Sequence, residues 1–351
     1  MIEIVQAPQT FNFSLSLPDF LLLSDQARVE MRVFDDEENV IISEIYDMPP
    51  SGQHLVIKLS RLIDIMLTGS RPEENISVDD SVVKSFNVQF DDGDDIRNNT
   101  ITVIKGYVRR QPFDVSGFLR DRWLNLVPQV SYVNYYQPLY LTAYPTANVT
   151  VYAKARMKDG SDNTVELGNM VAHRMQSVNL NPGRMIQVLG GDYQYFDVYT
   201  MNGSSIANGY KRFFFTDRFE FNADTFFYLN RLGGWDTLIL TGERNNKNTG
   251  TVSSALFDEY EQEFNQVPKL EIEKNSGWIK TEEHRRQCID FIYSTQRYHL
   301  HEGALRPIVM SNPEMNYVNG ELNSFGFTYR YSDQKVAYPE LGISPYHLII
   351  E

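Results

Sequence analysis

Short alternating strands follow one another at intervals of about ten residues, and this spacing constrains the fold more than any other feature. In ARVEMRVFDDEENV, for example, Val29, Met31 and Val33 alternate with polar residues, and residues 35–39 then supply an acidic turn. Across residues 130–220 no helical pattern of about 10 to 15 residues separates the strands, as a parallel α/β sheet would require. The pattern therefore predicts antiparallel sheets.

We expect a mainly β protein made of two successive antiparallel β-sandwich-like domains, followed by an α+β module with one amphipathic helix. Residues 1–112 form the first domain, residues 113–222 the second and residues 223–351 the module. Within the second domain we interpret residues 185–191, MIQVLGG, as a strand. Residues 244–250 are rich in Asn and Lys, which favours an exposed loop.

The amphipathic helix is predicted in TEEHRRQCIDFIYST, which begins at Thr281. Thr281 is suited to cap the first turn, and the two glutamates that follow it favour the positive end of the helix dipole. Cys288, Phe291 and Ile292 fall on one face at helical spacing, so this face should contact the core of the module.

Charge and cysteine content exclude several classes of protein. The chain has 32 basic and 46 acidic residues, a net charge of −14, which disfavours nucleic acid as a partner. Its single cysteine, Cys288, rules out an intramolecular disulfide. Residues 1–30 lack the basic start and apolar stretch of a secretory signal, and no apolar run approaches the roughly 18 residues of a membrane span. We therefore expect synthesis in the cytoplasm without membrane insertion.

Catalytic and metal-binding patterns are weak throughout. The sequence contains no GxSxG, GxxxxGK[ST] or HExxH motif. Residues 91–95, DDGDD, are interpreted as a hairpin turn, and His299 and His301 share one face of a strand without further ligands nearby in sequence. Cys288 has no recognisable activating environment. We expect no enzyme activity, no catalytic residue, no metal site and no cofactor, although a pair of carboxylates facing each other across a cleft cannot be recognised from sequence.

Aromatic residues are the most informative excess, with 21 tyrosines, 21 phenylalanines and 3 tryptophans. Tyrosine suits wet interfaces because its ring can be buried while its hydroxyl finds a partner. The rings could fill a subunit interface, stack on sugars, or simply alternate between core and surface. The candidate interface or glycan-contacting residues lie in SYVNYYQPLYLTAYP and are Tyr132, Tyr135, Tyr136, Tyr140 and Tyr144.

A succession of aromatic and glycine motifs runs through the C-terminal part of the chain. The motifs are Phe227-Tyr228-Leu229-Asn230-Arg231, Gly233-Gly234-Trp235-Asp236-Thr237, Ser276-Gly277-Trp278, Phe291 to Ser294, Arg306-Pro307-Ile308-Val309, and Leu322-Asn323-Ser324-Phe325 continuing to Tyr331. With them, residues 213–351 resemble proteins encoded in tail or baseplate gene clusters of phages and prophages of Bacteroides-type bacteria. The resemblance implies a structural subunit of a virion tail, built as a symmetric ring, and it carries over no catalytic residue.

The sequence and this resemblance together favour a non-enzymatic structural subunit of a bacteriophage tail, at the tail tip, in the distal tail or in a baseplate-like position. Its partners would be copies of itself in a ring and other tail proteins, and its place the virion tail. Two alternatives stay open. One is a carbohydrate-binding adhesin of the tail tip, with a host surface glycan as partner, and the other is a β-sandwich glycan hydrolase.

Overall fold

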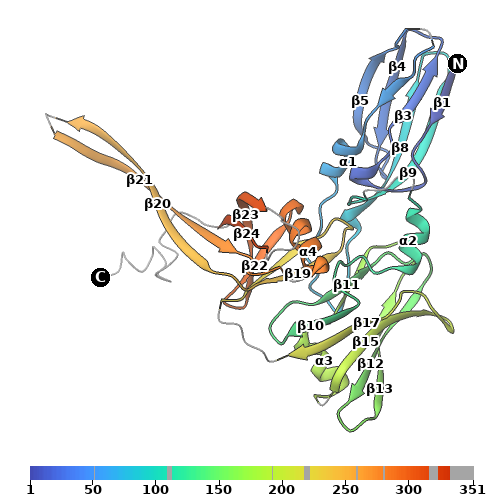
Figure 1. Ribbon diagram of the computed structural model, residues 1–351. Helices are drawn as coiled ribbons and strands as arrows, with labels where there is room; N and C mark the ends of the chain where they lie inside the picture. The colour runs from blue at the N-terminus through green and yellow to red at the C-terminus, as the bar shows by residue number, and fades with distance from the viewer. Residues whose placement is uncertain are drawn as a thin grey trace. The chain divides into compact units, whose positions relative to one another are not determined.

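A computed structural model describes residues 1–50, 52–108, 113–191, 193–216, 222–257, 260–279, 281–315 and 323–332. In these ranges the chain is mainly β, as the sequence predicts (Figure 1). It forms two compact units. Unit 1 comprises Met1–Asp217 and Leu229–Asp236, and unit 2 comprises Arg218–Tyr228 and Thr237–Glu351.

The first sandwich of unit 1 packs a three-stranded sheet against a five-stranded one around a single core. The alternation predicted at Val29, Met31 and Val33 is confirmed, because all three side chains are fully buried. Phe20 and Phe90 meet edge to face across this core at 5.2 Å. The sheets are β1(Ile2–Gln6)-β3(Phe20–Ser24)-β6(Leu55–Ile57) and β2(Phe11–Phe13)-β9(Ile96–Ile104)-β8(Val83–Asp91)-β4(Arg28–Phe34)-β5(Val40–Asp47), with the helices α1(Ser60–Met66), η1(Ser14–Ser16) and η2(Asp80–Val82).

The second sandwich of unit 1 has its own core, built by a larger sheet, a three-stranded sheet and one helix. Most strand pairs in unit 1 are antiparallel as predicted, but β2 pairs parallel to β9, and β10 pairs parallel to β17. The sheets are β10(Val130–Asn134)-β17(Lys211–Thr216)-β15(Tyr193–Asn202)-β12(Val149–Met157)-β13(Asp162–Met170), with β16(Ser205–Ile206) beside β15, and β11(Tyr140–Ala143)-β14(Gln176–Asn179)-β7(Ile76–Val78). The helix α2(Val115–Asp121) precedes β10 in the chain.

The strand predicted for residues 185–191 is wrong, because this segment belongs to the helix α3(Pro182–Leu189). Met185 and Leu189, four residues apart, are both buried in the core of the second sandwich. Pro182 occupies the start of the helix, where its missing N–H has no cost, and Gly190 ends it at a φ of 84°. The Val and Ile content suggested a strand, but this Pro and Gly placement was the stronger signal.

Unit 2 is a seven-stranded sheet covered by the predicted helix, now α4(Glu282–Tyr293). The Thr281 hydroxyl accepts a hydrogen bond from the His284 amide, which confirms the predicted cap. Phe291 packs against Phe226 and Phe327 of the sheet, at 5.2 and 5.5 Å between ring centroids. No helix in the described ranges has the length and apolar character needed to cross a membrane. The strand order is β19(Trp235–Leu240)-β18(Asp224–Leu229)-β22(Arg297–His301)-β23(Ala304–Met315)-β24(Phe325–Tyr331)-β21(Tyr260–Asn275)-β20(Arg244–Phe257).

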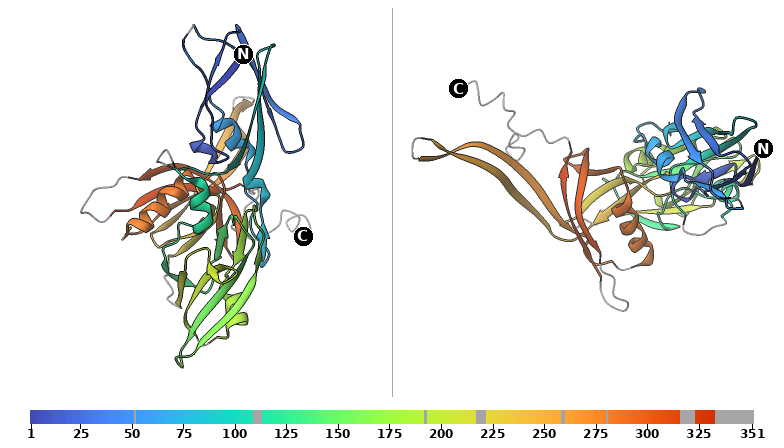
Figure 2. Two further views of the ribbon diagram at one scale, coloured as in Figure 1. Left: turned by 90° about the vertical axis from the view of Figure 1, so that its right-hand side faces the viewer. Right: turned by 90° about the horizontal axis from the view of Figure 1, so that it is seen from above.

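A long two-stranded arm extends from this sheet (Figures 1 and 2). β21 pairs with β24 only over Ile272–Asn275, so in the described ranges β20 and β21 continue beyond that point paired only with each other. We define the arm as residues 248–257 and 260–270. The loop predicted for residues 244–250 is therefore wrong, since these residues begin β20. Residues 244–247 are exposed and show no alternation of apolar and polar side chains, which explains why the sequence reads as a loop.

Candidate functional site

The structure divides the five candidate tyrosines into two groups. Tyr132, Tyr135 and Tyr136, on β10 and in the turn after it, are 74%, 41% and 85% exposed. Tyr140 and Tyr144 are only 8% and 3% exposed. Tyr144 packs edge to face on Phe11 at 6.1 Å, and the Tyr140 hydroxyl accepts a hydrogen bond from Asn181. The first group can meet a ligand or a partner, whereas the second group belongs to the interior of unit 1.

Tyr132 belongs to a row of aromatic rings on the outer face of the larger sheet. The parallel register of β10 and β17 pairs Tyr132 with Phe214, and their rings stack at 5.3 Å. Phe214 in turn contacts Tyr195 of β15 at 5.3 Å. Because side chains alternate across a strand, these positions face away from the core that buries Phe196 and Phe213. The row therefore presents ring surface to solvent.

The guanidinium of Arg212 lies beside this aromatic row and is held in place by two neighbours. Its Nε and Nη2 atoms donate to the two carboxylate oxygens of Asp197 at 2.7 and 2.8 Å. Its guanidinium carbon lies 4.0 Å from the ring centroid of Tyr195. A guanidinium held both by a two-point carboxylate pair and by an aromatic face has little freedom left to lose on binding a ligand.

A hollow of about 550 Å³ lies beside Arg212, on the outer face of strands β10, β12, β13, β15 and β17. Lys154 and Arg156 approach it from β12, and each lies 2.9 Å from a different oxygen of Asp162. Hydrogen bonds from both cations lower the pKa of Asp162, so this carboxylate is ionised at neutral pH. The charged residues lining the hollow are Lys154, Arg156, Arg212, Asp162 and Asp197.

We call this surface the Arg212 face and define it by the aromatic row and these charged residues, together with Tyr210. Sequence reasoning found only Tyr132 of this set. Apart from Tyr210, which precedes β17, the other members come from the strands β12, β13, β15 and β17. On β12, β15 and β17 they occupy alternate positions, which in sequence look like an ordinary solvated face. The one available signal was the concentration of Tyr, Lys and Arg at alternate positions of β12, β15 and β17.

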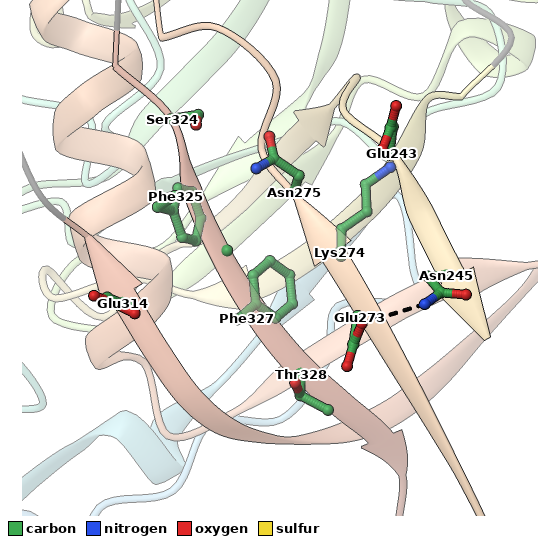
Figure 3. Close-up of a pocket in the computed structure, with 11 residues that line it drawn as sticks. Glu243, Asn245, Glu273, Lys274, Asn275, Glu314, Ser324, Phe325, Phe327 and Thr328 are labelled. Atoms are coloured by element: carbon green, nitrogen blue, oxygen red, sulfur yellow. Dashed lines mark hydrogen bonds between the residues drawn. The ribbon is translucent and has the colours of Figure 1, made fainter. Parts of the chain in front are cut away.

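A second hollow, of about 540 Å³, lies on unit 2 where β20, β21 and β24 run side by side (Figure 3). Its carboxylates are Glu243, Glu273 and Glu314, and Asn245 donates to Glu273 at 3.3 Å. The rings of Phe325 and Phe327 in its lining are buried within unit 2. This hollow offers acidic groups without an exposed ring face, so the Arg212 face is the better candidate for binding.

A buried charged network lies in the interior of unit 2. The Lys274 amino group donates to the carbonyl oxygens of Asn222 and Gly242 at 2.7 and 2.8 Å, and it pairs with Asp224 at 2.8 Å. His299 is 1% exposed, with Nε2 3.2 Å from Asp224 and Nδ1 2.8 Å from the Tyr331 hydroxyl. Lys274 thus has two carbonyl acceptors and one ion-pair partner, and both His299 nitrogens have protein partners. The groups thus hold one another in place within the fold.

The other sequence candidates contribute no metal cluster in the part of the chain that the structure describes. Residues 91–95 join β8 to β9, which confirms the interpretation as a hairpin turn. His301 stacks on the buried His299 at 5.7 Å. Cys288 faces the core of unit 2, as predicted.

Cys288 gives a direct test of this packing. Burial raises the pKa of its thiol to about 12, so the reactive thiolate is scarce at pH 8. We expect no measurable reaction of the native protein with a chromogenic disulfide reagent at pH 8, and one thiol per chain once denaturant is added. Rapid modification of the native protein would mean that the face of α4 that carries Cys288 is not packed against the sheet of unit 2.

Comparisons with known proteins add little to this geometry. No family model matches the chain, and no curated protein sequence matches it. Among solved structures, the chain is similar to the neural ectodermal development factor IMP-L2, at 8% identity and a TM-score of 0.15, over 61% of this chain and 93% of that one. A superposition of this quality carries no argument about fold or function.

Proposed function

We propose that the chain is a non-enzymatic structural subunit of a bacteriophage tail, which assembles with copies of itself and with other tail proteins. The arm is the observation that carries the assembly role. An isolated two-stranded ribbon is marginally stable in water. No other strand among the described residues pairs with the outer edges of the arm, so the N–H and C=O groups there can add a strand from another chain. A partner on the arm would satisfy those groups and bury its faces.

The place in a tail comes from the resemblance of residues 213–351 to proteins of tail and baseplate gene clusters. The negative charge of the chain makes assembly depend on salt. A net charge of −14 keeps free subunits apart at low salt, where the screening length is about 30 Å at 0.01 M. At 0.15 M the length falls to about 8 Å, so subunits can approach one another.

We therefore expect the protein to be monomeric at low salt and to associate as salt and concentration rise. In a shortened variant, residues 249–269 are replaced by Asn-Gly, which joins Asn248 to its partner Leu270 in a two-residue turn. Without the arm we expect the variant to stay monomeric under all conditions. Light scattering and negative-stain imaging across salt and protein concentration measure the oligomeric state of the natural chain and of the shortened variant.

The control keeps the arm at full length. Ser254 donates to Glu261 on the exposed surface of the arm, and the double variant Ser254→Ala, Glu261→Ala removes this pair. We expect it to assemble like the natural chain. Unchanged thermal unfolding of unit 2 shows that the shortened variant is folded. Equal assembly with and without the arm would contradict the proposal, as would a tight oligomer that does not depend on salt.

A further inference from the structure

We propose that the Arg212 face is a binding site for acidic oligosaccharides, meaning sugars that carry carboxylate or sulfate groups. The site lies wholly on unit 1 and goes beyond the assembly role, because it uses no residue of the arm. Three features support it: an exposed aromatic row, a held guanidinium, and a local excess of positive charge beside a hollow.

The aromatic row supplies the apolar half of such a site. Sugar rings present C–H faces that pack on aromatic faces, and ring surfaces with a few placed polar groups are what ligand sites generally combine. Tyr132 is stacked on Phe214 and remains largely exposed, so its outer face is available without rearrangement. At the far side of Arg212, Tyr210 contacts Tyr199 at 4.7 Å. Rings thus lie on both sides of the cation.

The charged groups select an acidic ligand. Lys154, Arg156 and Arg212 oppose Asp162 and Asp197, which leaves one positive charge in excess on a chain whose net charge is −14. The Asp197 pair uses Nε and Nη2 of Arg212, so Nη1 lies outside that pair and can donate to a ligand oxygen. Cations next to ring faces suit a sugar acid better than a neutral sugar.

Nucleic acid fits this face less well. Its affinity depends on many phosphate contacts, and three cations amid a strongly acidic chain supply few. A short glycan needs only one or two charge contacts beside the stacked rings. The site should therefore bind weakly and in a salt-dependent way, because its cations are partly exposed.

The test uses the full chain on an array that carries uronic-acid, sialic-acid and sulfated oligosaccharides beside their neutral parent sugars. We expect at least one acidic class to bind and its neutral parent to bind about tenfold more weakly. The affinity for the best binder is then measured by calorimetry at low salt. Arg212→Gln and Tyr132→Ala should each weaken it by about tenfold.

Tyr136→Ala is the matched control, since Tyr136 is an exposed tyrosine of the adjacent turn and lies outside the aromatic row. We expect its affinity to be unchanged. Asp162→Asn tests the charge argument in the opposite direction, because it frees Lys154 and Arg156 from their shared carboxylate. It should strengthen binding of the acidic sugar by about two- to fivefold, a gain that misfolding cannot produce.

Three other results would overturn the proposal. The absence of binding to every acidic glycan would do so, as would equal binding of acidic and neutral sugars. Affinity unchanged in Arg212→Gln would place the binding elsewhere on the chain. Because the shortened-arm variant retains the whole Arg212 face, it should bind these sugars normally, so failure of the assembly role and failure of this site can be told apart.

Discussion

We expect the Asp236→Ala variant to lose about 3–5 kcal/mol of the free energy of unfolding of unit 1. Asp236 is fully buried, and its Oδ1 accepts a hydrogen bond from Asn125 Nδ2 at 2.9 Å. Its Oδ2 accepts from the Leu126 amide at 2.9 Å and from Asn230 Nδ2 at 2.7 Å. Burial raises the pKa of Asp236, and these donors oppose that rise. Alanine would leave the Leu126 amide and one N–H of Asn230 without their acceptor in a buried site, whereas Asn125 Nδ2 keeps the carbonyl oxygens of Tyr140 and Trp235.

Urea unfolding followed by the fluorescence of the buried Trp123 and Trp235 measures this loss. Asp36→Ala, in an exposed turn, should change the free energy by less than about 0.5 kcal/mol. Asp236→Asn separates charge from geometry. An amide must turn its NH₂ group toward at least one of the existing donors, so we expect a loss of about 2–3 kcal/mol. A loss below about 1 kcal/mol in both Asp236 variants would refute the role of this residue.

The same hydrogen-bond network explains why glycines occupy positions 233 and 234. Asn230 Oδ1 accepts from the amides of Leu232 and Gly234, which closes the turn between β18 and β19. A side chain at Gly234 would come within 2.3 Å of the Leu124 carbonyl oxygen, and Gly233 has a φ of 78°. The motif thus fixes a tight turn against the segment at Leu124. Sequence alone marks the glycines but not their partner, which lies about a hundred residues earlier.

The sequence predicted correctly those strands and helix ends that depend on a few neighbouring residues. The strand alternation at Val29 and the cap at Thr281 each depend on a few neighbouring residues, and both predictions are confirmed. The helix α3 was missed because β-branched residues outweighed Pro182 and Gly190 in the interpretation. The strand β20 was missed because its exposed first residues, 244–247, show no alternation of apolar and polar side chains.

The candidate site could not be predicted, for a different physical reason. Tyr132 contacts Phe214 only because β10 lies parallel to β17, a pairing between segments about eighty residues apart. The prediction of uniformly antiparallel sheets excluded that neighbour. Arg212 and Asp197 likewise meet through the register of two strands. Residue type and spacing describe single strands, whereas this site exists only across strands.

We expect Lys274→Met to lower the free energy of unfolding of unit 2 by about 3–5 kcal/mol. Lys274 is buried, and its removal leaves Asp224 with less compensating charge and two backbone carbonyls without their donor. Hydrogen exchange of peptides from β18, β21 and β22 reports the stability of this unit directly. Lys247→Met is the matched control on β20, because the Lys247 side chain is exposed and its amino group lies 3.9 Å from the Glu273 carboxylate, an ion pair that contributes little to stability.

The same network should make unit 2 sensitive to acid. Burial alone would raise the pKa of Asp224, but hydrogen bonds from His299 and Lys274 lower it to about 2, from an ordinary value of 3.8. The folded state therefore holds this proton less tightly than the unfolded chain. The stabilisation, about 2 kcal/mol, is present above about pH 4 and is lost as pH falls toward 2. In Lys274→Met the pKa of Asp224 rises, so the loss should start at higher pH, whereas Asp224→Asn should remove this pH dependence. Identical acid profiles for the natural chain and Asp224→Asn would show that another carboxylate controls the transition.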